Sequence, residues 1–152
     1  MKITRLYISP EHNYFGHHEK PAGKAPSVAC QEVEAVAGMG LRGDRFFGWK
    51  DDYKGQVTFF AEETWERLCD QLNVADKGPE VFRRNIVTRG ADLKALIGKE
   101  FEVQGIRFFG TQEAAPCYWM NQAFGGGAEK ALHGAGGLRA KVLSDGVLRC
   151  DG

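Results

Sequence analysis

The stretch Phe82-Arg83-Arg84-Asn85-Ile86-Val87-Thr88-Arg89-Gly90 joins two adjacent arginines to a short run of β-branched residues. Branched side chains favour pleated structure and glycine favours a break, so we expect a strand over residues 85–88. Between Arg83 and Lys94 there are four basic residues and one acidic residue, a local excess of three positive charges. Such a segment is interpreted either as one side of a pocket for a small anion or as a solvated face, the commoner role of a charge run.

Outward from this stretch, short apolar runs alternate with turn residues, and the chain contains 20 glycines. Strands are predicted over residues 2–9, 28–36, 56–60, 101–103, 106–109, 138–143 and 147–150. Gln104-Gly105 forms the turn of one predicted hairpin, and Asp145-Gly146 is interpreted as a two-residue loop of type I′. Short strands outnumber helices, with no regular alternation of the two. The pattern favours a mainly β fold with a few helices, a closed or partly open β-barrel rather than a doubly wound sheet.

One amphipathic helix is predicted after residue 61. Acidic residues occupy its first turns, where the helix dipole favours them. An apolar stripe follows at spacings of i, i+3, i+4 and i+7, formed by Trp65, Leu68, Cys69 and Leu72. We therefore expect Cys69 to lie in the core. Residues 92–96 are expected to form a separate helical turn.

Bulk composition limits the class of protein. A chain of 152 residues is expected to form a single domain over residues 1–152. Twenty basic residues balance 20 acidic ones, which gives no electrostatic support to binding of nucleic acid or of a membrane surface. No apolar segment approaches the ~18 residues of a membrane helix. The four cysteines form no CxxC pair, and no secretory signal is evident, so we expect a reducing, cytoplasmic setting.

One of these cysteines, Cys117, has neighbouring residues that favour a reactive thiolate. Pro116 is suited to the first position of a helix, and a cysteine just inside a helix start is favoured as thiolate. A thiolate ligates soft metals or carries sulfur. The alternative is a small buried hydrophobe, the usual role of a free cysteine.

Four segments in this order resemble the MOSC domain, a module found at the C-terminus of molybdenum-cofactor sulfurases and as free-standing bacterial proteins. They are Gly40-Leu41-Arg42-Gly43-Asp44-Arg45, Phe82 to Gly90, Ala115-Pro116-Cys117, and His133-Gly134-Ala135-Gly136-Gly137-Leu138-Arg139-Ala140. The resemblance extends from about residue 28 to the last residue. It implies a β-rich, barrel-like fold that binds molybdenum cofactor or handles its terminal sulfur.

The resemblance also implies roles for individual residues. The hallmark cysteine of the family corresponds to Cys117, which would ligate molybdenum. Many members have a second cysteine three residues earlier, where this chain has Ala114. This departure disfavours a mechanism that requires two vicinal thiols. Arg83 and Asn85 match family positions that contact the cofactor.

Further residues are candidates for the anionic end of the cofactor, which is a pterin dithiolene ending in a phosphate or in an extended nucleotide. Guanidinium groups and bare backbone amides suit such an anion. The candidates are Arg45, Thr88, Arg89, Gly136, Gly137 and Arg139, with Arg84 as an adjacent donor. For Arg84 and Arg89 a solvated strand edge, and for Arg45 a structural salt bridge with Asp44, are equally good interpretations.

Two functions follow from the resemblance. The first is a redox enzyme whose molybdenum centre reduces N-hydroxylated or N-oxide small molecules with electrons from a separate reductase. The second is a carrier of persulfide or of cofactor, which would need a cysteine desulfurase as partner because the chain lacks a lysine-bearing domain for pyridoxal phosphate. The sequence leaves the oligomeric state and the roles of His17, His18 and His133 open.

Overall fold

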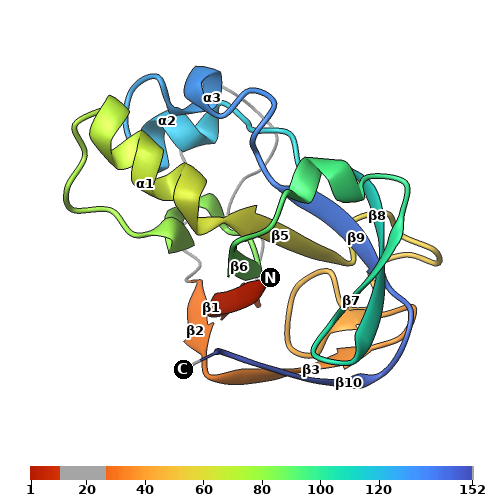
Figure 1. Cartoon of the computed structure of the whole chain (residues 1–152). Coiled ribbons are helices and arrows are strands. Elements are labelled where there is room, and N and C mark those ends of the chain that lie inside the picture. The colour runs from red at the N-terminus through yellow and green to blue at the C-terminus, as the bar shows by residue number, and fades with distance from the viewer. Residues whose placement is uncertain (11–26, 152) are drawn as a thin grey trace.

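The computed structural model describes residues 1–10 and 27–151, and the fold is mainly β. Figure 1 shows the α-helices gathered at one end of the molecule and most of the strands at the other. The elements are β1 (Lys2–Ile8), β2 (Val28–Cys30), β3 (Glu32–Val36), β4 (Gly40–Leu41), β5 (Val57–Ala61), α1 (Glu62–Gln71), η1 (Pro79–Phe82), β6 (Ile86–Arg89), η2 (Leu93–Leu96), β7 (Glu100–Val103), β8 (Ile106–Glu113), α2 (Trp119–Ala123), α3 (Ala128–Ala131), β9 (Leu138–Val142) and β10 (Gly146–Arg149).

The described strands form two sheets. Seven strands pair in the order β2-β1-β6-β5-β9-β8-β7, and three pair in the order β10-β3-β4. Every pair is antiparallel except β5 with β6. The large sheet ends at β2 and β7, so the sheets are not closed into a barrel and the closed-barrel expectation is not confirmed.

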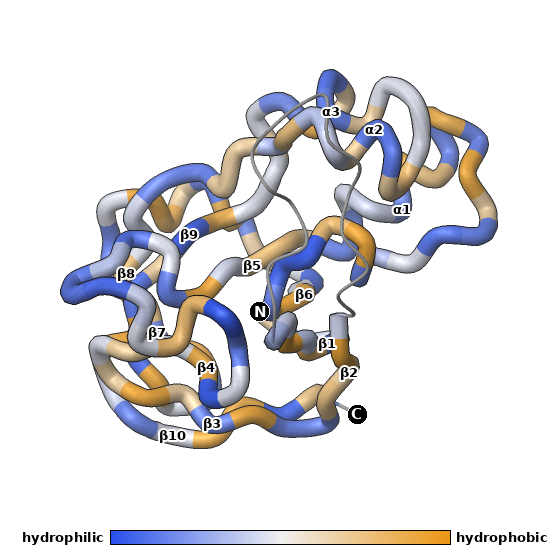
Figure 2. The backbone as a smooth tube through the Cα atoms, turned by 180° about the vertical axis from the view of Figure 1, so that it is seen from behind, coloured by the Kyte–Doolittle hydropathy of each residue, from blue (hydrophilic) through white to orange (hydrophobic). Residues whose placement is uncertain are grey.

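Two apolar clusters lie on opposite faces of β5, because successive side chains of a strand point to opposite faces. Phe59 belongs to the first cluster, with residues of both sheets, and its ring packs edge-on against Phe108 at 5.2 Å. Phe60 belongs to the second cluster, which includes Leu68 of α1 and Phe124 at the end of α2. Both phenylalanines are fully buried. The backbone coloured by hydropathy in Figure 2 shows apolar segments within both the strand and the helical parts.

Several local predictions are confirmed. The amphipathic helix is α1, whose stripe packs on the second cluster with Leu68 buried. Cys69, expected in the core, is only partly buried and packs against the edge of that cluster. The helical turn is η2, capped by the Asp92 carboxylate, which accepts from the Ala95 amide. The hairpin joins β7 and β8 through Gln104 and Gly105, both with positive φ.

Two local predictions are wrong, and both concern which strands pair. Residues 28–36 form two strands, because β2 pairs with β1 whereas β3 pairs with β10 in the other sheet, and the chain bends at Gln31 between them. Residues 145–146 do not form a hairpin turn. Gly146 lacks positive φ and begins β10, and the Asp145 carboxylate accepts a hydrogen bond from the Ala37 amide. Among the described residues, no helix has the length and apolar character to span a membrane.

Candidate functional site

A cavity of 250 Å³, which we call the cationic cavity, is lined by four arginines from three separate parts of the chain. They are Arg45, Arg83, Arg84 and Arg139. Thr58, Gln112 and Glu113 also line it, and Glu113 is the only acidic residue among the described lining residues. Segments nearly a hundred positions apart therefore bring positive charge to one hollow.

The sheet register positions Arg139 in this cavity. Arg139 on β9 lies across from Thr58 on β5 and from Gln112 on β8, so three polar side chains form a row over three adjacent strands. The guanidinium of Arg139 lies 5.9 Å from the centre of the Tyr53 ring, a cation–π contact. The ring orients the arginine without neutralising it.

Arg83 reaches the cavity because the 3₁₀ helix η1 ends there. Its backbone has the left-handed conformation at φ 57°, which stops the helix and turns the chain into β6. Its backbone amide donates to the Glu80 carbonyl at 3.0 Å. The residue is only 5% exposed, so its charge lies within the protein at the wall of the cavity.

Arg84 joins three loops through backbone carbonyls. Its Nε donates to the Gly136 carbonyl at 2.8 Å, Nη1 to Phe82 at 3.2 Å, and Nη2 to Ala114 at 3.0 Å. Nη2 also lies 3.4 Å from the Ala115 carbonyl. Of the two interpretations that the sequence left open for Arg84, the solvated strand edge does not describe this residue. Arg84 holds the segment that leads to Cys117.

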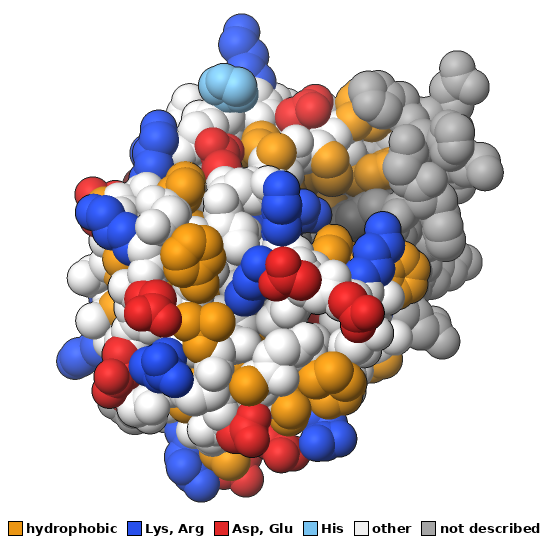
Figure 3. Space-filling view, turned by 90° about the vertical axis from the view of Figure 1, so that its right-hand side faces the viewer, with side chains coloured by type: hydrophobic (Ala, Val, Ile, Leu, Met, Phe, Trp, Pro, Cys, Tyr) orange, Lys and Arg blue, Asp and Glu red, His pale blue; other side chains and the backbone are white. Residues whose placement is uncertain are grey.

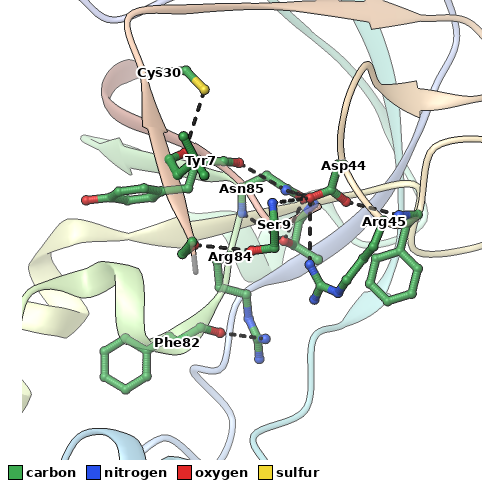
Figure 4. Close-up of polar contacts among 12 residues, drawn as sticks. Tyr7, Ser9, Cys30, Asp44, Arg45, Phe82, Arg84 and Asn85 are labelled. Atoms are coloured by element: carbon green, nitrogen blue, oxygen red, sulfur yellow. Dashed lines mark hydrogen bonds and ion pairs between the residues drawn. The ribbon is translucent and has the colours of Figure 1, made fainter. Parts of the chain in front are cut away.

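Asn85 is the centre of a buried hydrogen-bond network beside the cavity (Figure 4). Its Oδ1 accepts from the amide and hydroxyl of Thr58 at 3.0 and 3.1 Å, and its Nδ2 donates to the Tyr7 carbonyl at 3.2 Å and to Asp44 Oδ1 at 3.1 Å. The same carboxylate oxygen of Asp44 accepts from the Ser9 amide at 2.8 Å. Asn85 thus fastens β5, the end of β1 and the loop after β4 together.

That loop presents Arg45 to the cavity. Arg45 Nη1 lies 3.6 Å from Asp44 Oδ1, and its guanidinium lies 4.4 Å from the centre of the Phe46 ring. Its amide donates to the Ser9 carbonyl at 2.9 Å. The cavity-lining position and the Asp44 ion pair, which the sequence left as alternatives, occur together.

Cys117 lies just before a helix rather than inside one. Helix α2 begins at Trp119, and the Cys117 carbonyl accepts from the Met120 amide at 3.1 Å. The thiol is half-buried and packs against the second apolar cluster. Cys117 is not among the described residues that line the cationic cavity, but Ala115, two positions earlier, is.

The remaining sequence candidates lie elsewhere. Thr88 is fully buried within the sheet beside Ile3 and Ala61, and Arg89 forms surface ion pairs with Glu62 and Glu66 on α1. Neither is among the described residues lining the cationic cavity.

The glycine pair serves close packing. A Cβ on Gly136 would collide with the Ala114 carbonyl oxygen, and the Gly137 carbonyl accepts from the Ala114 amide at 2.9 Å. Gly136 therefore lets its loop approach the end of β8, where Arg84 binds both segments.

Of the histidines, His12, His17 and His18 lie outside the described residues. His133 lines a second, more open hollow of 460 Å³, with Pro116, Glu129 and Lys130. Glu113 and Ala115 line both hollows, so the two adjoin at the segment before Cys117. Figure 3 shows one face of the molecule, where Lys and Arg side chains are interspersed with Asp and Glu.

Sequence reasoning missed Thr58 and Gln112 as cavity residues and undervalued Arg84. Thr58 and Gln112 are polar residues within strands, and this pattern could have indicated that they face a polar surface. Only the pairing of β5, β9 and β8 shows that both lie across from Arg139. Among the described residues, no three His, Cys, Asp or Glu side chains are placed to hold a metal ion.

Comparison with known proteins agrees with the resemblance. Among solved structures, the chain is similar to the YUAD protein from Bacillus subtilis, with a TM-score of 0.72 and 17% identity over 97% of this chain and 90% of that one. It is also similar to YiiM from Geobacillus stearothermophilus, with a TM-score of 0.69 and 14% identity over 97% and 70% of the two chains. YiiM from Escherichia coli is similar with a TM-score of 0.65 and 16% identity, over 99% of this chain and 67% of that one.

These identities are low enough that the likeness concerns the fold alone. No curated protein matches the sequence. The family model described as the MOSC domain matches residues 30–151, which is most of the chain and includes all four segments recognised in the sequence. The chain therefore belongs to the MOSC domain family.

Proposed function

We propose that this domain binds molybdenum cofactor at the cationic cavity, with Cys117 as the thiolate ligand of the metal. MOSC domains are generally associated with binding of this cofactor. The observation that carries the proposal is the convergence of Arg45, Arg83 and Arg139 on one hollow whose lining continues through Ala115, two residues before Cys117.

The residues present fit the charge of this group. A phosphate is bound best by planar guanidinium donors, and several arginines around one hollow outweigh the single carboxylate of Glu113. Arg45, Arg83 and Arg139 would hold the anionic end. Arg84 and Asn85 act behind them, because their hydrogen bonds fix the loops that carry the cavity wall.

At the metal end of the cofactor, the chain would supply one soft ligand, the thiolate of Cys117. Thiolate is a ligand that soft metal sites select, and the described residues offer no cluster of three further ligands. When bound, the cofactor would supply two-electron redox chemistry, with a separate reductase as the electron source. Reduction of an N-hydroxylated compound consumes two electrons and two protons and releases one water. The chain's own contribution is to bind the anion, orient the thiol and shape the adjoining hollow.

Metal and pterin analysis tests the binding proposal. Protein would be purified from a host that makes the cofactor, as wild type and as the variants Cys117→Ser and Arg139→Gln. We expect near-stoichiometric molybdenum and pterin in the wild type, loss of molybdenum in Cys117→Ser, and at least a tenfold loss of pterin in Arg139→Gln, about 1.4 kcal/mol of binding. Arg107→Gln is the matched control, because Arg107 is an exposed arginine whose partner is Glu100 on the neighbouring strand.

Two results would contradict this proposal. One is wild-type protein free of metal and pterin, and the other is a loss of pterin in Arg107→Gln equal to that in Arg139→Gln. Loaded protein should then reduce hydroxylamine-type compounds when supplied with a chemical reductant. If instead Cys117 carries one additional sulfur atom by mass and no molybdenum is present, the persulfide carrier becomes the better interpretation. No observation among the described residues favours that carrier over the redox enzyme.

A further inference from the structure

Two half-buried cysteines lie close together near the last strand, apart from the cationic cavity. Cys30 is the last residue of β2, and Cys150 directly follows β10. Both line one cavity of 150 Å³ that also touches Arg5 and Tyr7 of β1. In Figures 1 and 2 the end of β10 lies beside β2. Residues 120 positions apart are thus brought side by side.

The backbone holds the two cysteines in adjacent positions. The Cys150 amide donates to the Gln31 carbonyl at 3.0 Å, and the Cys150 Sγ lies 3.5 Å from the Cys30 carbonyl oxygen. The pairing of Arg149 with Glu32 continues to Cys150 across from Gln31, so Cys30 is the diagonal neighbour of Cys150 on the adjacent chain. The Cys30 Sγ lies 3.6 Å from the Val28 carbonyl oxygen and would turn from it toward Cys150 to form a disulfide. Both side chains pack at the edge of the first apolar cluster, so they share one local environment.

The chain around Cys150 is fixed on both sides. The Arg149 amide donates to Gln104 Oε1 at 2.8 Å, and Gln104 Nε2 donates to the Arg149 carbonyl at 2.7 Å. The Asp151 amide donates to the Ile3 carbonyl at 2.8 Å, and the Ile3 amide donates to the Asp151 carboxylate at 2.6 Å. Little conformational freedom remains to be lost when the two sulfurs join, which favours a bond between them over a bond to an outside thiol.

We propose that Cys30 and Cys150 are an oxidation site, at which a reversible disulfide ties the end of β10 to the end of β2. The oxidant is a disulfide of a small thiol, such as oxidised glutathione. One cysteine thiolate attacks it and releases one small thiolate, and the second cysteine then displaces the other. The two cysteines lose two protons and two electrons, an S–S bond forms between them, and the oxidant is reduced to two small thiols.

The environment of Cys30 sets the pace of this reaction. Burial raises the pKa of the Cys30 thiol and outweighs a backbone hydrogen bond from Ile8, and Cys150 nearby raises it further. Arg5 and Tyr7 are the other titratable groups lining the cavity. Thiolate is the attacking species, so bridge formation should accelerate as pH rises through the alkaline range.

The experiment oxidises the reduced full-length protein with oxidised glutathione and maps its peptides without reduction. We expect an intramolecular Cys30–Cys150 cross-link, reversed by dithiothreitol, in wild type and in Cys69→Ser. Cys30→Ser and Cys150→Ser should each lack the cross-link. Because the bridge would close a loop of 120 residues, the oxidised protein should melt about 10 °C higher than the reduced protein.

Three results would overturn the proposal. One is glutathione attached to each cysteine with no bridge between them. Another is a cross-link that involves Cys69 or Cys117 instead. The third is a bridged protein that melts below the reduced form, since such a bond would require a distorted structure. The proposal is independent of cofactor binding, because neither Cys30 nor Cys150 is among the residues that line the cationic cavity.

Discussion

At the scale of residues, the side chains at the site divide between the cavity wall and the support behind it. Arg83 and Arg139 face the hollow, whereas Asn85 is buried and forms hydrogen bonds with Tyr7 and Asp44 inside the protein. The family resemblance singled out Arg83 and Asn85 alike, because both belong to one short motif. Only the hydrogen bonds distinguish a residue that lines the cavity from one that fastens its wall.

Asn85→Ala should therefore lower stability. The change leaves the Thr58 amide, the Tyr7 carbonyl and the Asp44 carboxylate each short of one hydrogen bond in a buried place. We expect the free energy of unfolding to fall by about 3 kcal/mol, measured by urea denaturation. Asn121→Ala, which removes one half-buried bond to the Glu129 amide, should cost about 1 kcal/mol. Equal losses in the two variants would contradict a central role for Asn85.

Arg84→Lys tests whether this arginine holds the segment before Cys117. Lysine keeps the charge, but a single ammonium cannot reach the carbonyls of Phe82, Ala114 and Gly136 together. We expect alkylation of Cys117 by iodoacetamide to become about tenfold faster, a change of about 1.4 kcal/mol in the local opening equilibrium. Arg107→Lys is the control. An unchanged alkylation rate in Arg84→Lys would show that the segment is fixed by other contacts.

At the scale of elements, the sequence predicted structure wherever local chemistry decides it. Helix α1, the turn η2 and the hairpin of β7 and β8 all depend on residues within a few positions of each other. The pair Asp145-Gly146 has equally good turn chemistry, yet β10 pairs with β3, more than a hundred positions away. The failure has a physical cause: burial of Leu148 between the sheets outweighs a local turn preference.

The hairpin turn offers a test of backbone strain alone. Gly105 has φ 81° and a Cβ placed there would meet no atom within 4 Å, so Gly105→Ala adds conformational strain without a steric collision. We expect a loss of about 1 kcal/mol in unfolding free energy. Gly126→Ala is a matched control, because Gly126 also has open space but no positive φ. This control should be neutral or slightly stabilising. Similar losses at both sites would rule out strain at Gly105 as the cause.

We expect the contribution of Glu63, at the junction between α1 and β6, to the free energy of unfolding to depend on pH. Burial opposes ionisation of Glu63, but hydrogen bonds from the Gly90 amide and its own amide, with Arg89 nearby, lower the pKa of its carboxyl overall. A lowered pKa in the folded state stabilises the protein above the unfolded value, ~4.3, and this contribution is lost as pH falls through the folded value. The stability difference between wild type and Glu63→Gln should thus be constant above about pH 5.5 and shrink below about pH 4.

Measurement of that difference by urea denaturation across the pH range checks the prediction. Glu102→Gln, on an exposed position of β7, is the control for removal of a charge. A difference for Glu63→Gln that grows toward low pH would reverse the sign and contradict the assignment of the hydrogen bond to the ionised carboxylate.

At the scale of the whole molecule, strand β5 joins two parts with different sources of stability. On one face Phe59 belongs to a core shared by two sheets, and on the other Phe60 belongs to a core that the helices complete. The mainly β composition was predictable from short apolar runs and turn residues. The division into two sheets and the arginine convergence were not, because both depend on pairings between distant strands that leave no local pattern.

The helical part should open before the sheets do. Helices α2 and α3 have five and four residues, too short to persist without tertiary contacts. They are held largely by the second cluster, where the Phe124 ring lies 4.9 Å from the ring of Phe82. Phe124→Ala removes that contact, at a cost of about 3 kcal/mol. Native-state hydrogen exchange should show amides of residues 117–132 exchanging at least a hundredfold faster, with those of β5 and β9 much less affected.

Phe108→Ala is the matched control, because it removes a buried ring from the first cluster instead. Since that cluster joins both sheets, we expect the variant to accelerate exchange in β5 and β9 together with the helices. Cys117 packs against the second cluster, so its alkylation should follow the helical amides and be faster in Phe124→Ala than in wild type. If hydrogen exchange of strand amides and helix amides were accelerated equally in Phe124→Ala without denaturant, the molecule would open as one unit. The Cys117 segment would then lack the separate mobility that a two-part molecule provides.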